Sequence, residues 1–265
     1  MNLYLRELKS YWKAMTFWSL GIIFMVGAGI GKYSAFTSSG SMNLSDLFES
    51  MPKAFFAIFG LAGIPVDTFG GFYGMIYAYV AIMGAVFAVM IGSGILAKEE
   101  RDKTAEFLMV KPITRTRILA IKLLAALTLV VIFVGVTYAL SFVTIAQVSP
   151  NDRINGELAL MMLALFLVMV FYLSVSFFLA AYLKEAKKSS QLALLIMLGS
   201  YLVSVAMGII DNLEFFRIVV PFQYFRVVDL LELKLDPFYL ILTVAISVGA
   251  IGLSLYFYPK RDLMI

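Results

Sequence analysis

The chain lacks both cysteine and histidine among its 265 residues. Without cysteine it can form neither a disulfide nor a thiolate site, and without histidine it has lost the commonest metal ligand and general base. Charge is also scarce, because 14% of the residues are charged whereas 62% are hydrophobic. Soluble domains are about 45–50% apolar. The composition therefore predicts an integral membrane protein, with no catalytic residue and no metal site.

Six apolar stretches are long enough to cross a bilayer as a helix, which takes about 20 residues. The predicted spans cover residues 14–31, 72–97, 123–146, 158–183, 192–210 and 238–258. None of them contains Asp, Glu, Lys or Arg. Since ion and proton pathways usually use charged groups within the membrane, this absence argues against a secondary transporter. We expect an all-α polytopic membrane protein with a single transmembrane domain over residues 1–265.

The basic residues are distributed unequally between the two sides of this six-span arrangement. If both termini, the stretch 98–122 and the loop 184–191 share one side, that side holds 15 of the 21 basic residues. Basic residues near span ends favour the cytoplasm. The predicted location is therefore the plasma (cytoplasmic) membrane, with both termini cytoplasmic. The pI near 9.1 is explained in the same way, and no nucleic-acid partner is expected.

The ends of the first span carry two further signals. Leucines alternate with charged residues over 1–13, which predicts an interfacial N-terminal helix in contact with membrane lipid. Gly27 and Gly31 have the spacing that lets another helix approach closely. Residues 32–71 form a long connection to the second span.

Hydroxyl groups are the main polar side chains within the spans. Those that could line a mildly polar path for an amphipathic or hydrophobic substrate are Tyr77, Ser93, Tyr138, Tyr172, Ser176 and Tyr201. The alternative is that these hydroxyls form hydrogen bonds between helices. Both interpretations remain open at this point.

The most densely charged stretch lies between the second and third spans, at 98–122. A helix can run from Asp102 to Val110, and Pro112 disfavours a helical conformation at the residue before it. Thr114 or Thr116 can then cap the next helix. The Asp102–Val110 helix has apolar groups on two faces, which suits a helix held between two surfaces. The alternative is an interfacial helix that touches only lipid and its own spans.

The stretch SGILAKEERDKTAEFLMVKPITRTRILAIKLLAA resembles the permease subunits of ABC exporters of the second type. The N-terminal LRELKSYWKAMTFWSLG, the segment LFESMPKAFFAIFG and the terminal YFYPKRDL are similar to the same family. The resemblance implies a six-helix type-2 exporter permease with an interfacial N-terminal helix and a cytoplasmic coupling helix within 98–122. It also implies external interfacial helices within 211–237. The long connection at 32–71 departs from the compact members of the class.

The resemblance further implies a separate nucleotide-binding ATPase subunit and a second permease copy, as a homodimer or a heterodimer. ATP and magnesium would bind that ATPase, and no cofactor would bind this chain. Contact with the ATPase would fall on Glu99, Glu100, Arg101, Thr104, Glu106, Phe107, Pro112 and Arg115.

The function expected from the sequence is that of a membrane-spanning permease subunit in an ATP-driven ABC exporter. It would couple ATP hydrolysis by the partner subunit to export of an amphipathic or hydrophobic substrate, and would not itself be an enzyme. One alternative is a non-transporting membrane sensor or assembly protein that binds a cytoplasmic partner. A secondary transporter is the other.

Overall fold

The computed structural model describes residues 3–39, 56, 64, 68–101, 113–148, 154–183, 185–210 and 213–260. These residues are almost entirely helical and include no strand. Six of the helices are long and apolar enough to cross a membrane. They are α1 (Leu3–Ser39), α4 (Phe69–Arg101), α6 (Arg115–Val148), α7 (Asn155–Tyr182), α8 (Ala186–Ile209) and α10 (Pro237–Phe257). Each predicted span falls within one of them to within a residue, so the expected all-α membrane fold is confirmed.

Short helices occupy the connection between α8 and α10, where external helices were predicted. They are the 3-10 helices η1 (Glu214–Val219) and η2 (Pro221–Gln223) and the α-helix α9 (Val227–Leu231). A last 3-10 turn, η3 (Tyr258–Lys260), follows α10 directly. The connection contacts α4, α7 and α8, so it is part of the folded bundle.

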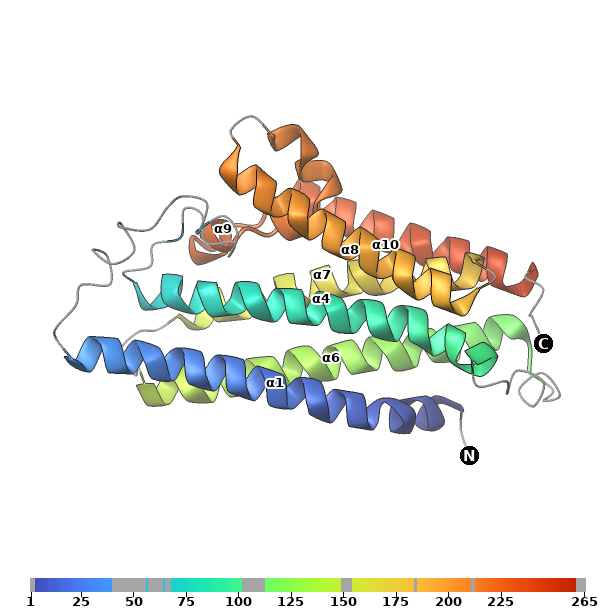
Figure 1. Ribbon diagram of the computed structural model, residues 1–265, viewed down its shortest axis with the longest axis horizontal. Helices are drawn as coiled ribbons and strands as arrows, with labels where there is room; N and C mark the ends of the chain where they lie inside the picture. The colour runs from blue at the N-terminus through green and yellow to red at the C-terminus, as the bar shows by residue number, and fades with distance from the viewer. Residues whose placement is uncertain are drawn as a thin grey trace.

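The long helices run side by side, and the start of α1 lies at the same end of the bundle as the end of α10 (Figure 1). We call this the terminal end; it contains the start of α1, the end of α4 and the start of α6. The opposite end contains α9, and we call it the α9 end (Figure 1). The charged stretch 98–122 therefore joins α4 to α6 at the terminal end.

Several helices begin at a residue whose side chain accepts a backbone hydrogen bond. Thr68 Oγ1 accepts one from the Gly71 amide at 3.0 Å, and Thr114 Oγ1 accepts one from the Arg117 amide at 3.4 Å. Asp236 caps α10 by accepting from the Phe238 amide at 3.0 Å. These side chains satisfy amide groups that lack an intrahelical partner. Of the two residues proposed as the cap of α6, the structure selects Thr114.

Helices α4 and α7 form the centre of the bundle. Within their most apolar windows, 72% and 67% of the residues are buried, against 11–44% in the other four spans. Gly92 of α4 meets α7 closely: a Cβ atom there would lie 2.1 Å from Ser176 Oγ and 2.6 Å from the Leu173 carbonyl oxygen. By contrast, a Cβ on Gly27 or Gly31 would meet no atom of the described residues within 4 Å. The close helix approach therefore occurs at Gly92 and not at the predicted pair.

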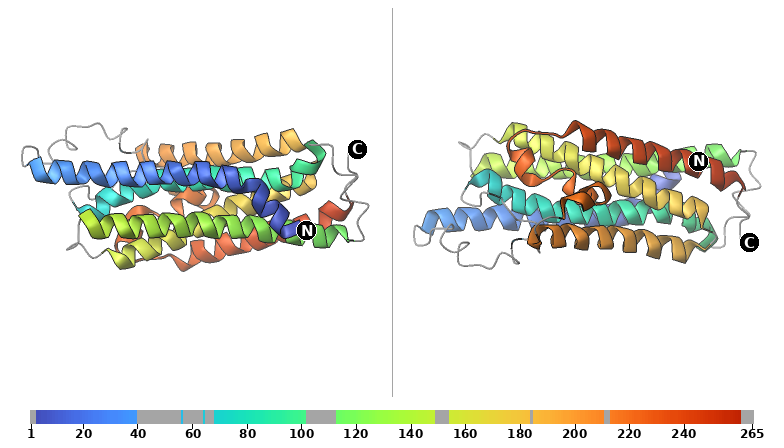
Figure 2. Two further views of the ribbon diagram at one scale, coloured as in Figure 1. Left: turned by 90° about the horizontal axis from the view of Figure 1, so that it is seen from below. Right: turned by 90° about the horizontal axis from the view of Figure 1, so that it is seen from above.

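The N-terminal segment and the first span form one continuous helix, α1. Figure 2 shows that the first turns of α1 bend toward α6. The Tyr4 hydroxyl is 2.9 Å from Thr128 Oγ1 of α6, and Tyr4, Leu8 and Tyr11 pack against the core. Side-chain contacts with neighbouring helices therefore hold this segment in the bundle. The predicted coupling helix, Asp102–Val110, lies outside the described residues.

Candidate functional site

A buried group of charged side chains joins three helices at the terminal end. Glu7 of α1, Lys98 of α4 and Lys122 of α6 form this group, which we call the Glu7 cluster. Glu7 Oε2 lies 3.6 Å from Lys98 Nζ, and Glu7 Oε1 lies 3.8 Å from Lys122 Nζ. The side chains of Glu7 and Lys122 have no exposed surface, whereas that of Lys98 is 20% exposed. A carboxylate shared by two ammonium groups thus connects α1, α4 and α6.

Hydrogen bonds and a further ion pair complete this cluster. Lys122 Nζ donates to the carbonyl oxygen of Ile95, and Lys98 Nζ donates to Ser10 Oγ at 2.8 Å. Arg6 is also 3.1 Å from Glu7 Oε1. Buried charges are stable only when they are paired and hydrogen-bonded. Glu7 is paired with both ammonium groups, although its Oε2 accepts no hydrogen bond in the described part of the chain. Removing Glu7 would leave the ammonium groups without a counter-charge.

The residues predicted to contact an ATPase subunit lie on both flanks of the same loop. Glu99, Glu100 and Arg101 belong to the last turn of α4. Arg115 begins α6, and its Nη1 donates to the Pro259 carbonyl oxygen at 3.1 Å. The other predicted contact residues, Thr104, Glu106, Phe107 and Pro112, lie outside the described residues.

A cavity lies toward the α9 end, between α4, α8 and the α8–α10 connection. Its volume is about 450 Å³, within the range of about 300–1,000 Å³ that is typical of ligand pockets. Ala78, Ala81 and Ile82 of α4 provide an apolar wall, and Val205 of α8 lies among the lining residues. The residues between η1 and α9 complete the lining with charged side chains.

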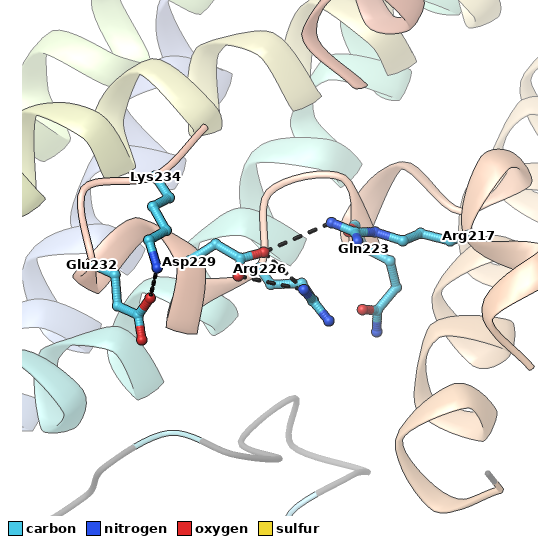
Figure 3. A network of polar contacts seen from close by, with 6 residues as sticks. All are labelled: Arg217, Gln223, Arg226, Asp229, Glu232 and Lys234. Atoms are coloured by element: carbon cyan, nitrogen blue, oxygen red, sulfur yellow. Dashed lines mark hydrogen bonds and ion pairs between the residues drawn. The ribbon is translucent and has the colours of Figure 1, made fainter. Parts of the chain in front are cut away.

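Arginine and carboxylate groups meet at the rim of this cavity (Figure 3). Arg226 binds Asp229 through Nε at 2.9 Å and Nη2 at 3.3 Å. Arg217 approaches the same carboxylate at 3.7 Å, while its Nε donates to the Gln223 carbonyl oxygen at 2.9 Å. The guanidinium of Arg217 also stacks over the ring of Tyr239, 4.2 Å from its centroid.

Two further contacts hold the rim in place. Gln223 Nε2 donates to Ser204 Oγ of α8 at 2.9 Å. Burial and the neighbouring Tyr239 raise the pKa of Tyr224 to about 12. The Tyr224 hydroxyl donates to the Ile218 carbonyl oxygen. The rim is thus attached to α8 and stabilised within the connection itself.

Three of the six predicted path residues come together at this cavity. Tyr77 of α4 and Tyr201 of α8 line it. Tyr172 of α7 lies next to them, because the ring of Phe222 is 5.3 Å from Tyr172 and 5.6 Å from Tyr201. The Tyr172 hydroxyl lies 2.6 Å from Ser200 Oγ.

The other three predicted path residues lie elsewhere. Ser93 donates to the Val89 carbonyl oxygen at 2.8 Å, and Ser176 donates to the Leu173 carbonyl oxygen at 2.9 Å. Both serine hydroxyls thus bond within their own helix. Tyr138 is exposed on α6 and stacks with Phe142. The structure therefore brings together three of the four tyrosines, Tyr77, Tyr172 and Tyr201, and separates Ser93, Ser176 and Tyr138 from them.

Sequence reasoning missed the Glu7 cluster because it treated Glu7 and Lys122 as surface charges at span ends. A signal was present for Lys122. Ile118 lies four residues before Lys122, Ala125 lies three residues after it, and Leu129 lies seven residues after it. All three are buried. This spacing places Lys122 on the core face of α6. Glu7 has a similar position, three residues after Tyr4 and four before Tyr11, which pack against the core.

Nothing in the described part of the chain resembles a catalytic or metal centre. The residues described there contain no group of His, Cys, Asp and Glu side chains that could hold a metal ion. The two arrangements found instead are a buried ionic connection between helices and a cavity with a charged rim. The first suits the transmission of movement and the second suits ligand binding.

Comparisons with known proteins agree with this description. A search of curated proteins found no match to the chain. The family model described as ABC-2 family transporter protein matches residues 1–263. This match covers nearly the whole chain, including all six spans and both ends of the bundle. The chain therefore belongs to the ABC-2 transporter family and is a multi-pass membrane permease.

Proposed function

We propose that this permease is the membrane subunit of an ATP-driven exporter. A separate ATPase subunit would supply the energy and bind the stretch 98–122. Two permease copies would form the working unit, and an amphipathic or hydrophobic substrate would leave between or through them. Family membership supports a partner ATPase in general, and no phosphate-binding loop is found in this sequence.

The observation that carries the proposal is the position of the Glu7 cluster. Lys98 precedes the charged loop and Lys122 follows it, and both ammonium groups meet the same carboxylate on α1. A displacement of the loop by a bound ATPase would therefore move the ends of α4 and α6 together with α1. Because α4 also packs on α7 and α8, the displacement would reach the cavity. This connection gives the loop a mechanical route to the centre of the bundle.

The proposed orientation places the terminal end in the cytoplasm, where an ATPase could reach the loop. The excess of basic residues on that side supports this orientation. Asn155 at the α9 end and Lys187 at the terminal end are both exposed. Since the chain has no cysteine, Asn155→Cys and Lys187→Cys would each introduce a single thiol. Asn155→Cys should react with an impermeant reagent from outside, and Lys187→Cys only after permeabilisation.

Co-purification with the ATPase tests the proposal. The isolated permease should not hydrolyse ATP, and the complex should. Phe107→Ala should weaken the complex by about 2 kcal/mol or more if the ring fills a pocket. Glu106→Ala, the neighbouring control, should cost less than about 1 kcal/mol because an exposed ion pair contributes little.

Both variants are compared at equal abundance in the membrane. Full association and full ATP turnover in Phe107→Ala would contradict the proposed contact. Transport driven by an ion gradient without ATP would identify a secondary transporter. An associated partner without any transport would identify a sensor or assembly protein.

A further inference from the structure

We propose that the cavity between α4, α8 and the α8–α10 connection binds one single-chain amphiphile with a zwitterionic head group. This ligand is a model of the transported substrate, and that interpretation alone rests on the proposed export function. The binding itself is a property of the permease alone. Three features support it: the size of the cavity, its apolar wall with one tyrosine hydroxyl, and the charged side chains at its rim.

The cavity is large enough for one hydrocarbon chain. A volume of about 450 Å³ corresponds to about 15 water molecules at about 30 Å³ each. A methylene group is similar in size to a water molecule, so a chain of about 12 carbons fits and a second one does not. Ala78, Ala81 and Ile82 supply an apolar wall for that chain. Along α8 the lining extends from Tyr201 to Gly208, which spans about 10 Å of helix.

One polar group in the wall is available to a ligand. Tyr77 lines the cavity and is only 3% exposed, and its hydroxyl makes no hydrogen bond within the described part of the chain. A hydroxyl that faces a cavity can both donate and accept a hydrogen bond. By contrast, the nearby Tyr172 hydroxyl is paired with Ser200 Oγ. Tyr77 is therefore positioned to bond to a polar atom of a bound molecule.

The rim favours a head group that carries both signs of charge. Arg217, Arg226, Asp229 and Glu214 contribute two positive and two negative groups to the lining. Arg217 is already engaged by Asp229, the Gln223 carbonyl oxygen and the ring of Tyr239. Arg226 also binds Asp229, but its side chain is 46% exposed and its Nη1 lies outside that contact.

Glu214 supplies the opposite charge. It begins η1, is exposed, and forms no ion pair with any residue in the described ranges. A bound molecule therefore meets one accessible guanidinium and one accessible carboxylate. A head group with an anionic and a cationic centre can pair with both side chains. A head group with a single charge can pair with only one of them and is repelled by the other.

Protection of single cysteines tests the site on the full-length permease in lipid nanodiscs. Ala78→Cys places a thiol in the cavity wall. Ala206→Cys is the matched control, because Ala206 is equally half-buried on α8 but does not line the cavity. The probes are dodecylphosphocholine, dodecyl sulfate and dodecyltrimethylammonium, which share one chain and differ in head-group charge. All are used below their micelle concentrations.

Dodecylphosphocholine should slow alkylation of Ala78→Cys at a concentration at least about 5-fold lower than either charged probe. Alkylation of Ala206→Cys should stay unchanged. Equal protection by the three probes would overturn the assignment of the head group. No protection of Ala78→Cys, or equal protection of both cysteines, would overturn the site.

Glu214→Gln in the Ala78→Cys background sharpens the test. Because Glu214 has no ion-pair partner in the described chain, this change leaves the fold intact. It should raise the half-protecting concentration of dodecylphosphocholine about 2- to 5-fold, as expected for an ion pair at an accessible surface. An unchanged concentration would overturn the role of Glu214. None of these measurements needs an ATPase, so they can fail or succeed independently of the proposed export function.

Discussion

Each end of the bundle has one carboxylate that is contacted by more than one cation. Glu7 at the terminal end meets Lys98, Lys122 and Arg6 and is fully buried. Asp229 at the α9 end meets Arg217 and Arg226, but its side chain is 29% exposed. Both groups consist of a carboxylate with more than one cation, but only the carboxylate of Asp229 is accessible to water. We infer that the first group fixes helices to one another and that the second remains able to rearrange around a ligand.

The difference follows from the energy of charges in different surroundings. Removing one partner of a buried ion pair typically costs about 3–5 kcal/mol, because the remaining charge is left without compensation. An exposed pair is worth less than about 1 kcal/mol, because water solvates each group and salt screens both. The terminal end should therefore be stiff and the α9 end adjustable. A transporter needs both properties, one to receive a force and the other to bind and release.

The largest effect is expected from Glu7→Gln. This change leaves Lys98 and Lys122 without their carboxylate and should lower the free energy of unfolding by about 3–5 kcal/mol. The matched control is Glu185→Gln, whose side chain is 50% exposed beside Lys188 and should cost less than about 1 kcal/mol. Unfolding of the purified proteins in detergent measures both. Equal stability of the two variants would remove the distinction between buried and exposed carboxylates.

An intermediate effect is expected between the two ends, where α4 contacts α7. Gly92→Ala places a methyl group against Ser176 and the Leu173 carbonyl and should cost about 1–3 kcal/mol through overpacking. Gly135→Ala on α6 is the control, because a Cβ there meets nothing within 4 Å and alanine favours a helix. If Gly92→Ala unfolds no more easily than Gly135→Ala, this contact is looser than described.

The smallest effect on stability is expected from Asp229→Asn. Its two arginines remain partly solvated, so the free energy of unfolding should change by less than about 1 kcal/mol. Its effect should also shrink as the salt concentration rises, because salt screens accessible charges. A loss as large as that of Glu7→Gln, at any salt concentration, would show that the α9 end is as rigid as the terminal end.

The sequence predicted the six spans because their hydrophobicity depends only on local composition. The family resemblance also placed short helices within 211–237, where η1, η2 and α9 lie. Predictions about contacts between helices were less successful. A Cβ on Gly27 or Gly31 meets no atom within 4 Å in the described part of the chain, whereas Gly92 makes the close contact. Gly92 follows Gly84 and Ala88 at four-residue spacing, which is the same kind of small-residue pattern.

The candidate site shows the same limit. Tyr77 and Tyr201 could be selected as polar groups within spans, but their meeting at one cavity depends on how α4 and α8 are placed. Likewise, Glu7 and Lys122 are 115 positions apart in the chain, and only the bend of α1 toward α6 brings them together. The proposed ATPase contacts within 102–112 stay predictions, since those residues lie outside the described ranges.

The central claim is that the Glu7 cluster connects the charged loop to the transmembrane helices. It is tested most directly by ATP turnover of the ATPase with the permease relative to the ATPase alone. Lys98→Gln is the test variant, because Lys98 is the most exposed member of the cluster. Lys188→Gln is the control, because it removes an equal charge from a 68% exposed side chain at the same end. The account predicts that Lys98→Gln lowers this ratio at least about 5-fold, the low end of typical coupling between sites, and that Lys188→Gln leaves it unchanged. A ratio in Lys98→Gln equal to that of the unaltered permease, at equal association with the ATPase, would contradict it.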